Sequence, residues 1–209
     1  MIREAVIRPA KPSDAPAIAA IYNQGIAERR ATFETRPRQA DDLVASIADA
    51  TRYPMLVAVD DADRPIGWGG FSRYRPRDCY AGIAEFSLYL DSSARGCGLG
   101  RRLLGALIEA ARDAGYWKLV SRIFTFNIAS RAICRATGFR EVGTYEKHAQ
   151  LDGEWLDVVI VERLIPENLH TRDAAAELVP ATDSHRGNNN PASNGAAIAA
   201  PPSQEIDHA

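Results

Sequence analysis

The hydrophobic positions along this chain follow two periods, the two-residue period of strands and the 3.6-residue period of helices. Ranges 5–10, 55–60, 65–74, 83–90 and 118–124 are predicted to be strands. Ranges 13–24, 39–50, 99–114 and 128–138 are predicted to be helices, the first capped by Ser13 or Asp14. Range 140–164 is predicted to be a closing hairpin that turns at the letters LDGE.

The order of these segments indicates how the strands pair. Strand 83–90, helix 99–114 and strand 118–124 form a strand-helix-strand unit, whose two strands are expected to be parallel. The other connections are short enough for antiparallel neighbours. We therefore predict an α/β fold with a mixed, mostly antiparallel central sheet and helices on both faces. Ligands of such sheets lie beyond the carboxyl ends of strands, which here is a glycine loop after strand 83–90.

Composition narrows the class of protein. The chain has 209 residues and a formal net charge of −2, which is typical of a single soluble domain and argues against a nucleic-acid binder. An apolar run of membrane-spanning length and a secretory signal are both missing, so we expect a cytoplasmic protein without a membrane partner. Cys79, Cys97 and Cys134 form no CxxC pair, so neither disulfides nor a metal site are expected.

Composition changes at Pro166. The stretch 166–209 is rich in Asn, Pro, Ser and Ala and has no aromatic residue, which predicts a disordered tail after a domain spanning 1–165. His170, His185 and His208 fall in that tail. His148 is therefore the only histidine of the predicted domain, which weakens any function that needs clustered histidines.

Glycines alternate in the stretch SARGCGLGRRLL, at Gly96, Gly98 and Gly100, just before helix 99–114. Successive main-chain N–H groups and the positive helix end favour a phosphate there, and Arg101 and Arg102 in the first turn fit a bound anion. A plain turn is the alternative. A P-loop is excluded because it needs Lys followed by Ser or Thr, and a dinucleotide fingerprint needs its third glycine where Arg101 stands.

Two signatures together resemble those of the GNAT-type N-acetyltransferases. The first is RGCGLG, in which Arg95, Gly98 and Gly100 match the RxxGxG pattern of the family's acetyl-CoA pyrophosphate loop; the second is NIASRAICRATGF at 127–139. The resemblance covers about residues 3–165 and implies acetyl-CoA as acetyl donor. The cofactor-binding residues that it implies are Leu88, Leu90, Arg95, Gly96, Cys97, Gly98, Leu99, Gly100, Arg101, Asn127 and Ser130.

Within that family, several segments resemble the phosphinothricin-type acetyltransferases: ATFETRP, RYRPRDCYAG, the start of EFSLYL and the closing hairpin. Phosphinothricin, methionine sulfoximine and arsinothricin are the α-amino substrates that this resemblance implies, and antibiotic resistance is the implied role. Arginine forks suit the anionic groups of such amino acids. The implied substrate-binding residues are Phe33, Thr35, Arg73, Tyr74, Arg75, Arg77 and Tyr80, with Trp155 as a further aromatic that closes the pocket.

An amine attacks a thioester only as the free base, so a group must accept its proton. The resemblance makes Glu85 the catalytic base, directly or through a water, and His148 is the rival by chemistry. Many family members place a Tyr where this chain has Cys134, so the thiolate either leaves without an acid or is protonated by another group such as Tyr145. Cys134 itself is interpreted as a packed, inert thiol.

Other functions stay open on the sequence alone. The same fold acetylates other primary amines, such as a polyamine or a peptide N-terminus. The missing Tyr at position 134 is compatible with a CoA-binding module without catalysis, and a dinucleotide enzyme is a third, remote alternative. Homodimerisation is a family expectation.

Overall fold

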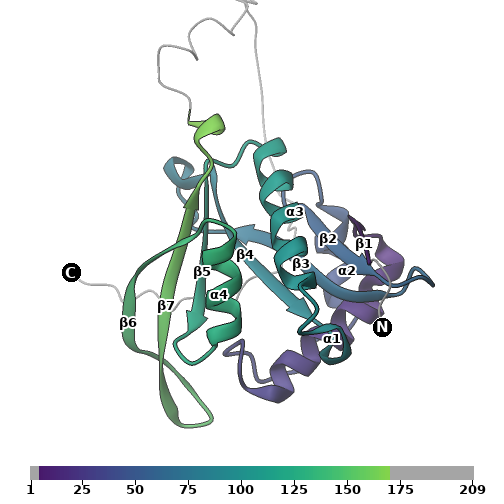
Figure 1. Cartoon of the computed structure of the whole chain (residues 1–209), viewed down its shortest axis with the longest axis horizontal. Coiled ribbons are helices and arrows are strands. Elements are labelled where there is room, and N and C mark those ends of the chain that lie inside the picture. Colours follow the sequence, from purple (N-terminus) through teal and green to yellow (C-terminus); the bar gives the residue numbers. More distant parts are fainter. Residues whose placement is uncertain (1–4, 170–209) are drawn as a thin grey trace, which may run out of the picture.

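The computed structural model describes residues 5–169 as a seven-stranded sheet between helices (Figure 1). The strands are β1 (Val6–Pro9), β2 (Met55–Val59), β3 (Pro65–Arg73), β4 (Ile83–Leu90), β5 (Lys118–Phe124), β6 (Arg140–Leu151) and β7 (Glu154–Leu164), in the order β1-β2-β3-β4-β5-β7-β6. Each neighbouring pair is antiparallel except β4 and β5. The predicted topology is confirmed.

The helices are α1 (Ala15–Glu28), α2 (Asp41–Ala48), α3 (Leu99–Asp113) and α4 (Ile128–Ala136). Helix α1 runs past its predicted end at Gln24. Gly25 is buried within the helix, and a Cβ at this position would lie 2.9 Å from the ring of Tyr89. Glycine thus permits close approach of the helix to the sheet without ending the helix. In the part of the chain that is described, no helix is long and apolar enough to cross a membrane.

Asp14 does not cap α1 with its side chain, contrary to the sequence prediction. Its carboxylate accepts hydrogen bonds from the Arg8 guanidinium at 2.7 and 3.1 Å and from the Lys11 main-chain N–H at 2.8 Å. The Arg8 hydrogen bonds lower the pKa of this carboxyl below its ordinary value. Asp14 thus occupies the N-cap position of α1, one of the two predicted, but makes no side-chain capping bond because Arg8 of β1 and the Lys11 N–H bind its oxygens.

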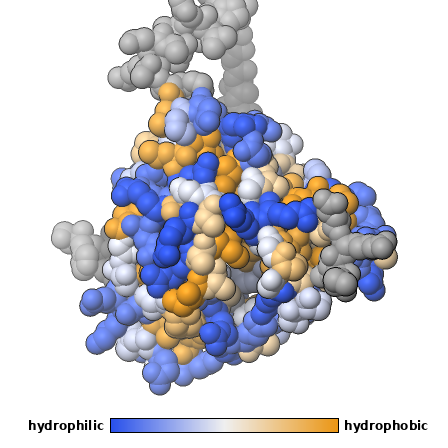
Figure 2. All heavy atoms as spheres, viewed as in Figure 1, coloured by the Kyte–Doolittle hydropathy of each residue, from blue (hydrophilic) through white to orange (hydrophobic). Residues whose placement is uncertain are grey.

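Alternation along the strands divides the core between the two faces of the sheet. Leu56 of β2 packs in the cluster that contains Leu103 and Leu107 of α3, whereas the next residue, Val57, packs in the cluster with Ile18 and other residues of α1 and α2. Helices therefore cover both faces, as predicted. The outer surface over α3 and α4 mixes hydrophilic and hydrophobic residues (Figure 2).

The closing hairpin turns at Asp152 and Gly153, whose φ angles are 50° and 86°. Two consecutive positive φ values are the geometry of a type I′ turn, which suits the twist of the strands. β6 forms one edge of the sheet. Beyond β7, Asn168 donates to the carbonyls of Arg112 and Tyr116 at 2.8 and 2.9 Å, which attaches residues 166–168 to the domain. Most of the predicted tail, residues 170–209, lies outside the described residues, with its three histidines.

Candidate active site

Strands β4 and β5 pair over only three positions and then diverge. Their parallel register runs from Ile83 opposite Lys118 to Glu85 opposite Val120, while β4 continues to Leu90 and β5 to Phe124. The second half of β4 therefore lacks a partner on its β5 side. This opening lies in the middle of the sheet, where Figure 1 shows the two arrows separating.

The main-chain groups of Leu88 and Leu90 point into this opening. The Asp91 N–H bonds the Ile66 carbonyl at 3.0 Å and so extends the β3–β4 ladder. Antiparallel strands alternate between residues that bond the neighbour and residues that face away from it, so Tyr89 bonds β3 whereas Leu88 and Leu90 face away. The sequence placed both leucines at a cofactor site, and the fold gives their amides free access to the gap.

The glycine loop begins directly after β4 and ends at the start of α3. Gly96 and Gly98 have φ values of 79° and 82°, a region that favours glycine. Within residues 5–169, no protein oxygen accepts a hydrogen bond from the main-chain N–H groups of Gly96, Cys97 and Gly98. The first three amides of α3, those of Leu99, Gly100 and Arg101, also have no helical partner, whereas the Arg102 N–H bonds the Gly98 carbonyl at 3.3 Å. The loop therefore presents a cluster of donors that suits an anion.

The other loop residues have different roles. A Cβ on Gly100 would lie 2.8 Å from the tip of Ile133, so this glycine allows α3 to approach α4. The Arg102 guanidinium donates to the Ala5 carbonyl at 2.7 Å and is therefore already bonded, which corrects its interpretation as a signal for an anion. Arg101 is exposed. Cys97 is exposed, and its thiol lies 3.2 Å from the Ala94 carbonyl.

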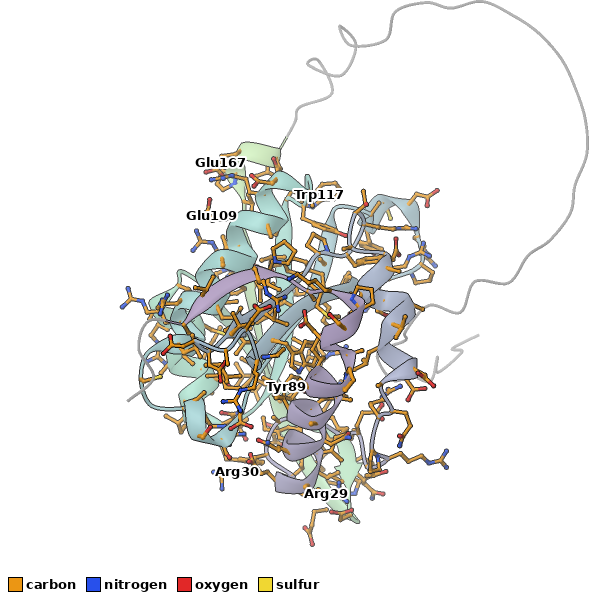
Figure 3. The ribbon with its side chains drawn as sticks, turned by 90° about the vertical axis from the view of Figure 1, so that its right-hand side faces the viewer. Arg29, Arg30, Tyr89, Glu109, Trp117 and Glu167 are labelled. Carbon is orange, nitrogen blue, oxygen red and sulfur yellow. The ribbon has the colours of Figure 1, made fainter. Side chains whose placement is uncertain are left out.

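Arg95 is held by two parts of the protein. Its Nη1 bonds both carboxylate oxygens of Glu28, at 2.9 and 2.8 Å, and its Nε and Nη2 bond the Leu90 carbonyl at 3.2 and 3.1 Å. Glu28 is the last residue of α1, so the end of this helix lies beside the glycine loop. Figure 3 shows that end of α1 with the following residues Arg29 and Arg30.

The second signature builds a helix cap. The Asn127 side-chain oxygen accepts a hydrogen bond from the Ser130 main-chain N–H at 3.1 Å, which caps α4. Its amide nitrogen donates to the Arg30 carbonyl at 3.2 Å. Asn127 and Ser130 are therefore brought together, and Asn127 links the start of α4 to the segment after α1.

Glu85 lies at the last paired position before the strands diverge. Ala84 and Phe86 are buried in the core beneath α3, so Glu85 faces the opposite side of the sheet, the side that α1 and α2 cover. Its carboxylate is bonded by the Arg122 guanidinium at 2.6 to 3.0 Å, and its side chain is only 14% exposed. Arg122 was missed by the sequence analysis because an arginine in a strand carries no signal until its partner strand is known.

His148 approaches this ion pair from β6. A bulge between Tyr145 and Ala149, with Lys147 at φ 47°, displaces the strand from its regular register. Burial and the charge of Arg122 lower the pKa of His148, while Glu85 opposes them, so the imidazole is neutral at pH 7. Its ring lies 6.2 Å from that of Phe33, which packs edge-on to Phe124 at 4.7 Å. Phe33 therefore lies between Phe124 and His148.

The predicted substrate residues of segment 73–80 are only partly brought together. The Tyr74 and Tyr80 rings pack at 5.9 Å, and the Arg75 guanidinium lies 5.3 Å from the Tyr74 ring centre. The Arg73 guanidinium instead bonds carbonyls of its own loop, those of Arg75 and Pro76. Arg77 is exposed. The remaining predicted pocket residues, Thr35 and Trp155, are exposed as well, Trp155 by 55%.

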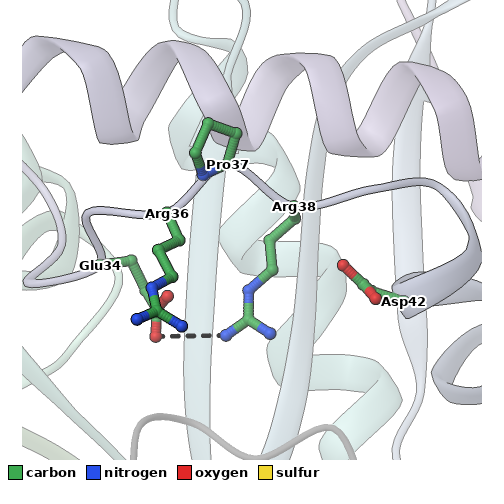
Figure 4. A pocket seen from close by; sticks show the side chains of 5 residues that line it. All are labelled: Glu34, Arg36, Pro37, Arg38 and Asp42. Atoms are coloured by element: carbon green, nitrogen blue, oxygen red, sulfur yellow. Dashed lines mark ion pairs between the residues drawn. The ribbon is translucent and has the colours of Figure 1, made fainter.

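A shallow cavity of about 330 Å³ lies beside the segment that joins α1 to α2 (Figure 4). Its lining includes both signs of charge, and Arg38 and Glu34 form an ion pair across it at 3.2 Å. Asn23 of α1 holds this segment by bonding both main-chain groups of Arg38, at 2.9 and 2.8 Å. The cavity lining is Glu34, Arg36, Pro37, Arg38 and Asp42. The residues described contain no cluster of three or more His, Cys, Asp or Glu side chains that could bind a metal.

The three cysteines are expected to differ in reactivity. Cys134 is 3% exposed and burial raises the pKa of its thiol to about 12, whereas Cys79 and Cys97 are exposed. Since the thiolate is the nucleophile, iodoacetamide at pH 7.5 should alkylate the native protein at Cys79 and Cys97 and spare Cys134. Mass spectrometry of the peptides checks this, and the urea-unfolded protein, in which all three react, is the control. Rapid alkylation of native Cys134 would contradict the inert interpretation.

Comparisons with known proteins agree with this geometry. The model of the acetyltransferase (GNAT) domain family matches residues 5–140. The chain is 36% identical to the L-methionine sulfoximine/L-methionine sulfone acetyltransferase of Pseudomonas aeruginosa, covering 76% of this chain and 93% of that protein.

Solved structures are similar as well. The GNAT superfamily phosphinothricin acetyltransferase from Sinorhizobium meliloti, solved in complex with acetyl-CoA, has a TM-score of 0.73 and 29% identity, covering 79% of this chain and 89% of that one. The ribosomal-protein-alanine N-acetyltransferase from Brucella melitensis has a TM-score of 0.73 and 33% identity, covering 77% of this chain and 99% of that one.

Proposed function

Because this chain belongs to the GNAT acetyltransferase family, we propose that it transfers the acetyl group of acetyl-CoA to the α-amino group of amino acids of the methionine sulfoximine and phosphinothricin class. The observation that carries this proposal is the opening between β4 and β5, with unpaired donors at one end and the carboxylate of Glu85 at the other. Resistance to such compounds and arsinothricin as a further substrate are part of the same proposal.

Acetyl-CoA would bind along the gap between β4 and β5. The free amides of Gly96, Cys97 and Gly98 and the first turn of α3 would hold its pyrophosphate, and the main-chain N–H groups of Leu90 and Leu88 would hold its pantetheine arm. From Leu90 to Glu85 the strand advances about 17 Å. The acyl group would thus pass through the sheet, from the loop before α3 to the face that carries Glu85. Leu88 N–H would stabilise the oxyanion of the tetrahedral intermediate.

Glu85 would act as the base, directly or through a water. The substrate ammonium gives one proton to the carboxylate, and the free amine then forms a bond to the thioester carbon. The carbon–sulfur bond breaks to release the CoA thiolate, and the second nitrogen proton passes to that thiolate or to water. Arg122 holds the carboxylate in place, at 2.6 Å, until the ammonium group of the substrate arrives. His148 is neutral and close, so it remains the second candidate base. Cys134 is a poor proton donor to the leaving thiolate, because its thiol is buried and burial raises its pKa to about 12.

The substrate would bind on the face that carries Phe33 and His148. Arg75 with Tyr74 and Tyr80 would bind its anionic groups, and Arg77 and Thr35 would contribute if their exposed segments close over it. Acetylation of a peptide N-terminus is the second candidate, because the Brucella melitensis relative has the same TM-score. A homodimer is proposed too: Val142, Tyr145 and Trp155 are 49 to 55% exposed on the edge hairpin β6–β7.

Release of CoA thiol tests the proposal. Phosphinothricin, methionine sulfoximine and arsinothricin are expected to be turned over, with spermidine, a peptide starting with alanine and a no-amine blank as comparisons. Turnover of the peptide alone would replace the proposed substrate class by the second candidate. Binding of acetyl-CoA without turnover of any amine would indicate a non-catalytic binding module. Light scattering of the protein in solution gives the oligomeric state.

A further inference from the structure

The last turns of α1 contact the glycine loop through two side chains of the same helix face. Gln24 donates to the Asp91 carboxylate at 2.7 Å and accepts from the Ser92 main-chain N–H at 3.1 Å. Glu28, one turn later, bonds Nη1 of Arg95. The Gln24 contact therefore attaches the loop to α1, and the Glu28–Arg95 ion pair is an addition to it.

Glu28 is unfavourably placed for α1 itself. It is the final residue of the helix, where the helix dipole is negative, and no basic residue stands in the last turn. Its charge is balanced by Arg95, which is 67 residues away in the sequence. The pair is partly exposed, by 42% for Arg95 and 34% for Glu28, so an incoming anion can reach it.

Arg95 can change partners without moving. Its Nε and Nη2 stay on the Leu90 carbonyl, and only Nη1 is bonded to Glu28. The free amides of Gly96, Cys97 and Gly98 follow directly in the chain, so an anion on these amides comes close to Nη1. Such an anion and the Glu28 carboxylate then compete for one donor, and their like charges repel each other.

We propose that Glu28 is a positioning residue that acts on the CoA diphosphate through Arg95: it holds the guanidinium ready in the free protein and returns to it to promote release of the product CoA. The inference rests on the proposed function and adds to it a residue that controls cofactor exchange. Glu28 touches no reacting atom. Its effect is expected in cofactor affinity and dissociation, and not in the chemical step.

The Glu28→Gln variant tests this. Loss of the competing charge should lower the Kd of acetyl-CoA and of CoA about three- to fivefold, mainly through slower dissociation, as measured by calorimetry and stopped-flow displacement. KM for acetyl-CoA should fall, while the single-turnover rate of acetyl transfer stays unchanged. Glu28→Asp, which keeps the charge, should bind like the wild type. A merely structural role would weaken binding in both variants.

Two further variants make the test specific. Glu109→Gln removes the same charge from the opposite end of the molecule (Figure 3), where Glu109 forms an ion pair with Arg112 on the surface of α3, and should leave the Kd unchanged. In an Arg95→Met background, Glu28→Gln should lose most of its effect. If Glu28→Gln raised the affinity for acetyl-CoA in the Arg95→Met background as much as in the wild type, the proposed role of Arg95 would be overturned.

The outcomes separate the two proposals. If the wild type binds acetyl-CoA and acetylates methionine sulfoximine, but Glu28→Gln binds acetyl-CoA with the same Kd and dissociation rate, the inference fails and the proposed function stands. If neither protein binds acetyl-CoA, the proposed function fails and the inference fails with it. If Glu28→Gln binds acetyl-CoA more tightly than the wild type and releases it more slowly, the result supports both proposals.

Discussion

Glu85→Gln is expected to lower kcat by about a hundredfold to a thousandfold, because general-base catalysis contributes an effect of that order. The amide keeps the shape of the side chain but cannot accept the proton of the substrate ammonium. The Kd of acetyl-CoA should stay within about twofold, since the anion-binding amides lie at the far end of the gap. Kinetics with methionine sulfoximine and calorimetry with acetyl-CoA measure the two effects.

The pH profile distinguishes a base from a structural carboxylate. An amino-acid ammonium has a pKa near ~9, so at higher pH the amine arrives already deprotonated and the defect of Glu85→Gln should shrink. Lost structure would not recover in this way. Full activity of the variant at pH 7 would rule out Glu85 and leave His148 as the base to test.

Glu141→Gln is the matched control. Glu141 is a carboxylate bonded by an arginine in the same forked manner, with Arg131 at 2.9 Å on both oxygens, but it lies beside α4 on the other face of the sheet. Loss of the Glu141 charge, and with it of the ion pair to Arg131, should change the free energy of unfolding but leave kcat unchanged. Equal losses of activity in both variants would mean that ion-pair loss, and not base catalysis, explains the result.

Gly98→Ala is expected to raise the Kd of acetyl-CoA at least about tenfold and to reduce the free energy of unfolding by about 1 kcal/mol. No atom lies within 4 Å of the added Cβ, so the cost comes from the φ of 82° and not from a clash. An alanine that relaxes out of the left-handed region rotates the Gly98 and Leu99 amides away from their common direction. Calorimetry and urea denaturation check the two values.

Gly105→Ala is the control for that substitution. Gly105 lies in the middle of the same helix, α3, also with nothing within 4 Å of an added Cβ, but its φ is not positive. Alanine there should stabilise the protein by about 0.5 to 1 kcal/mol and leave the Kd unchanged. If Gly98→Ala bound acetyl-CoA like the wild type, the loop would be an ordinary turn.

The sequence alone indicated the elements and the parallel β4–β5 unit because these depend on local periods and on connection lengths. The end of the first helix was predicted too early: α1 continues from Gln24 to Glu28, and Tyr89 packs against Gly25 within it. Similarly, Asp14 is a residue type that commonly caps helices, yet its carboxylate oxygens accept hydrogen bonds from Arg8. In the first case a residue of a distant strand, and in the second a residue of the strand just before the helix, outweighed the local preference.

For the candidate site, the sequence itself predicted the glycine loop, because its glycines are contiguous in the chain, whereas Glu85, Asn127 and Ser130 were predicted through the resemblance to the GNAT family. The tertiary structure alone decided which of these side chains are engaged: Arg122 on Glu85, Glu28 on Arg95 and the bulge that brings in His148. The physical reason is that charge pairing across strands and helices depends on register and packing, which bring together residues that are far apart in the sequence.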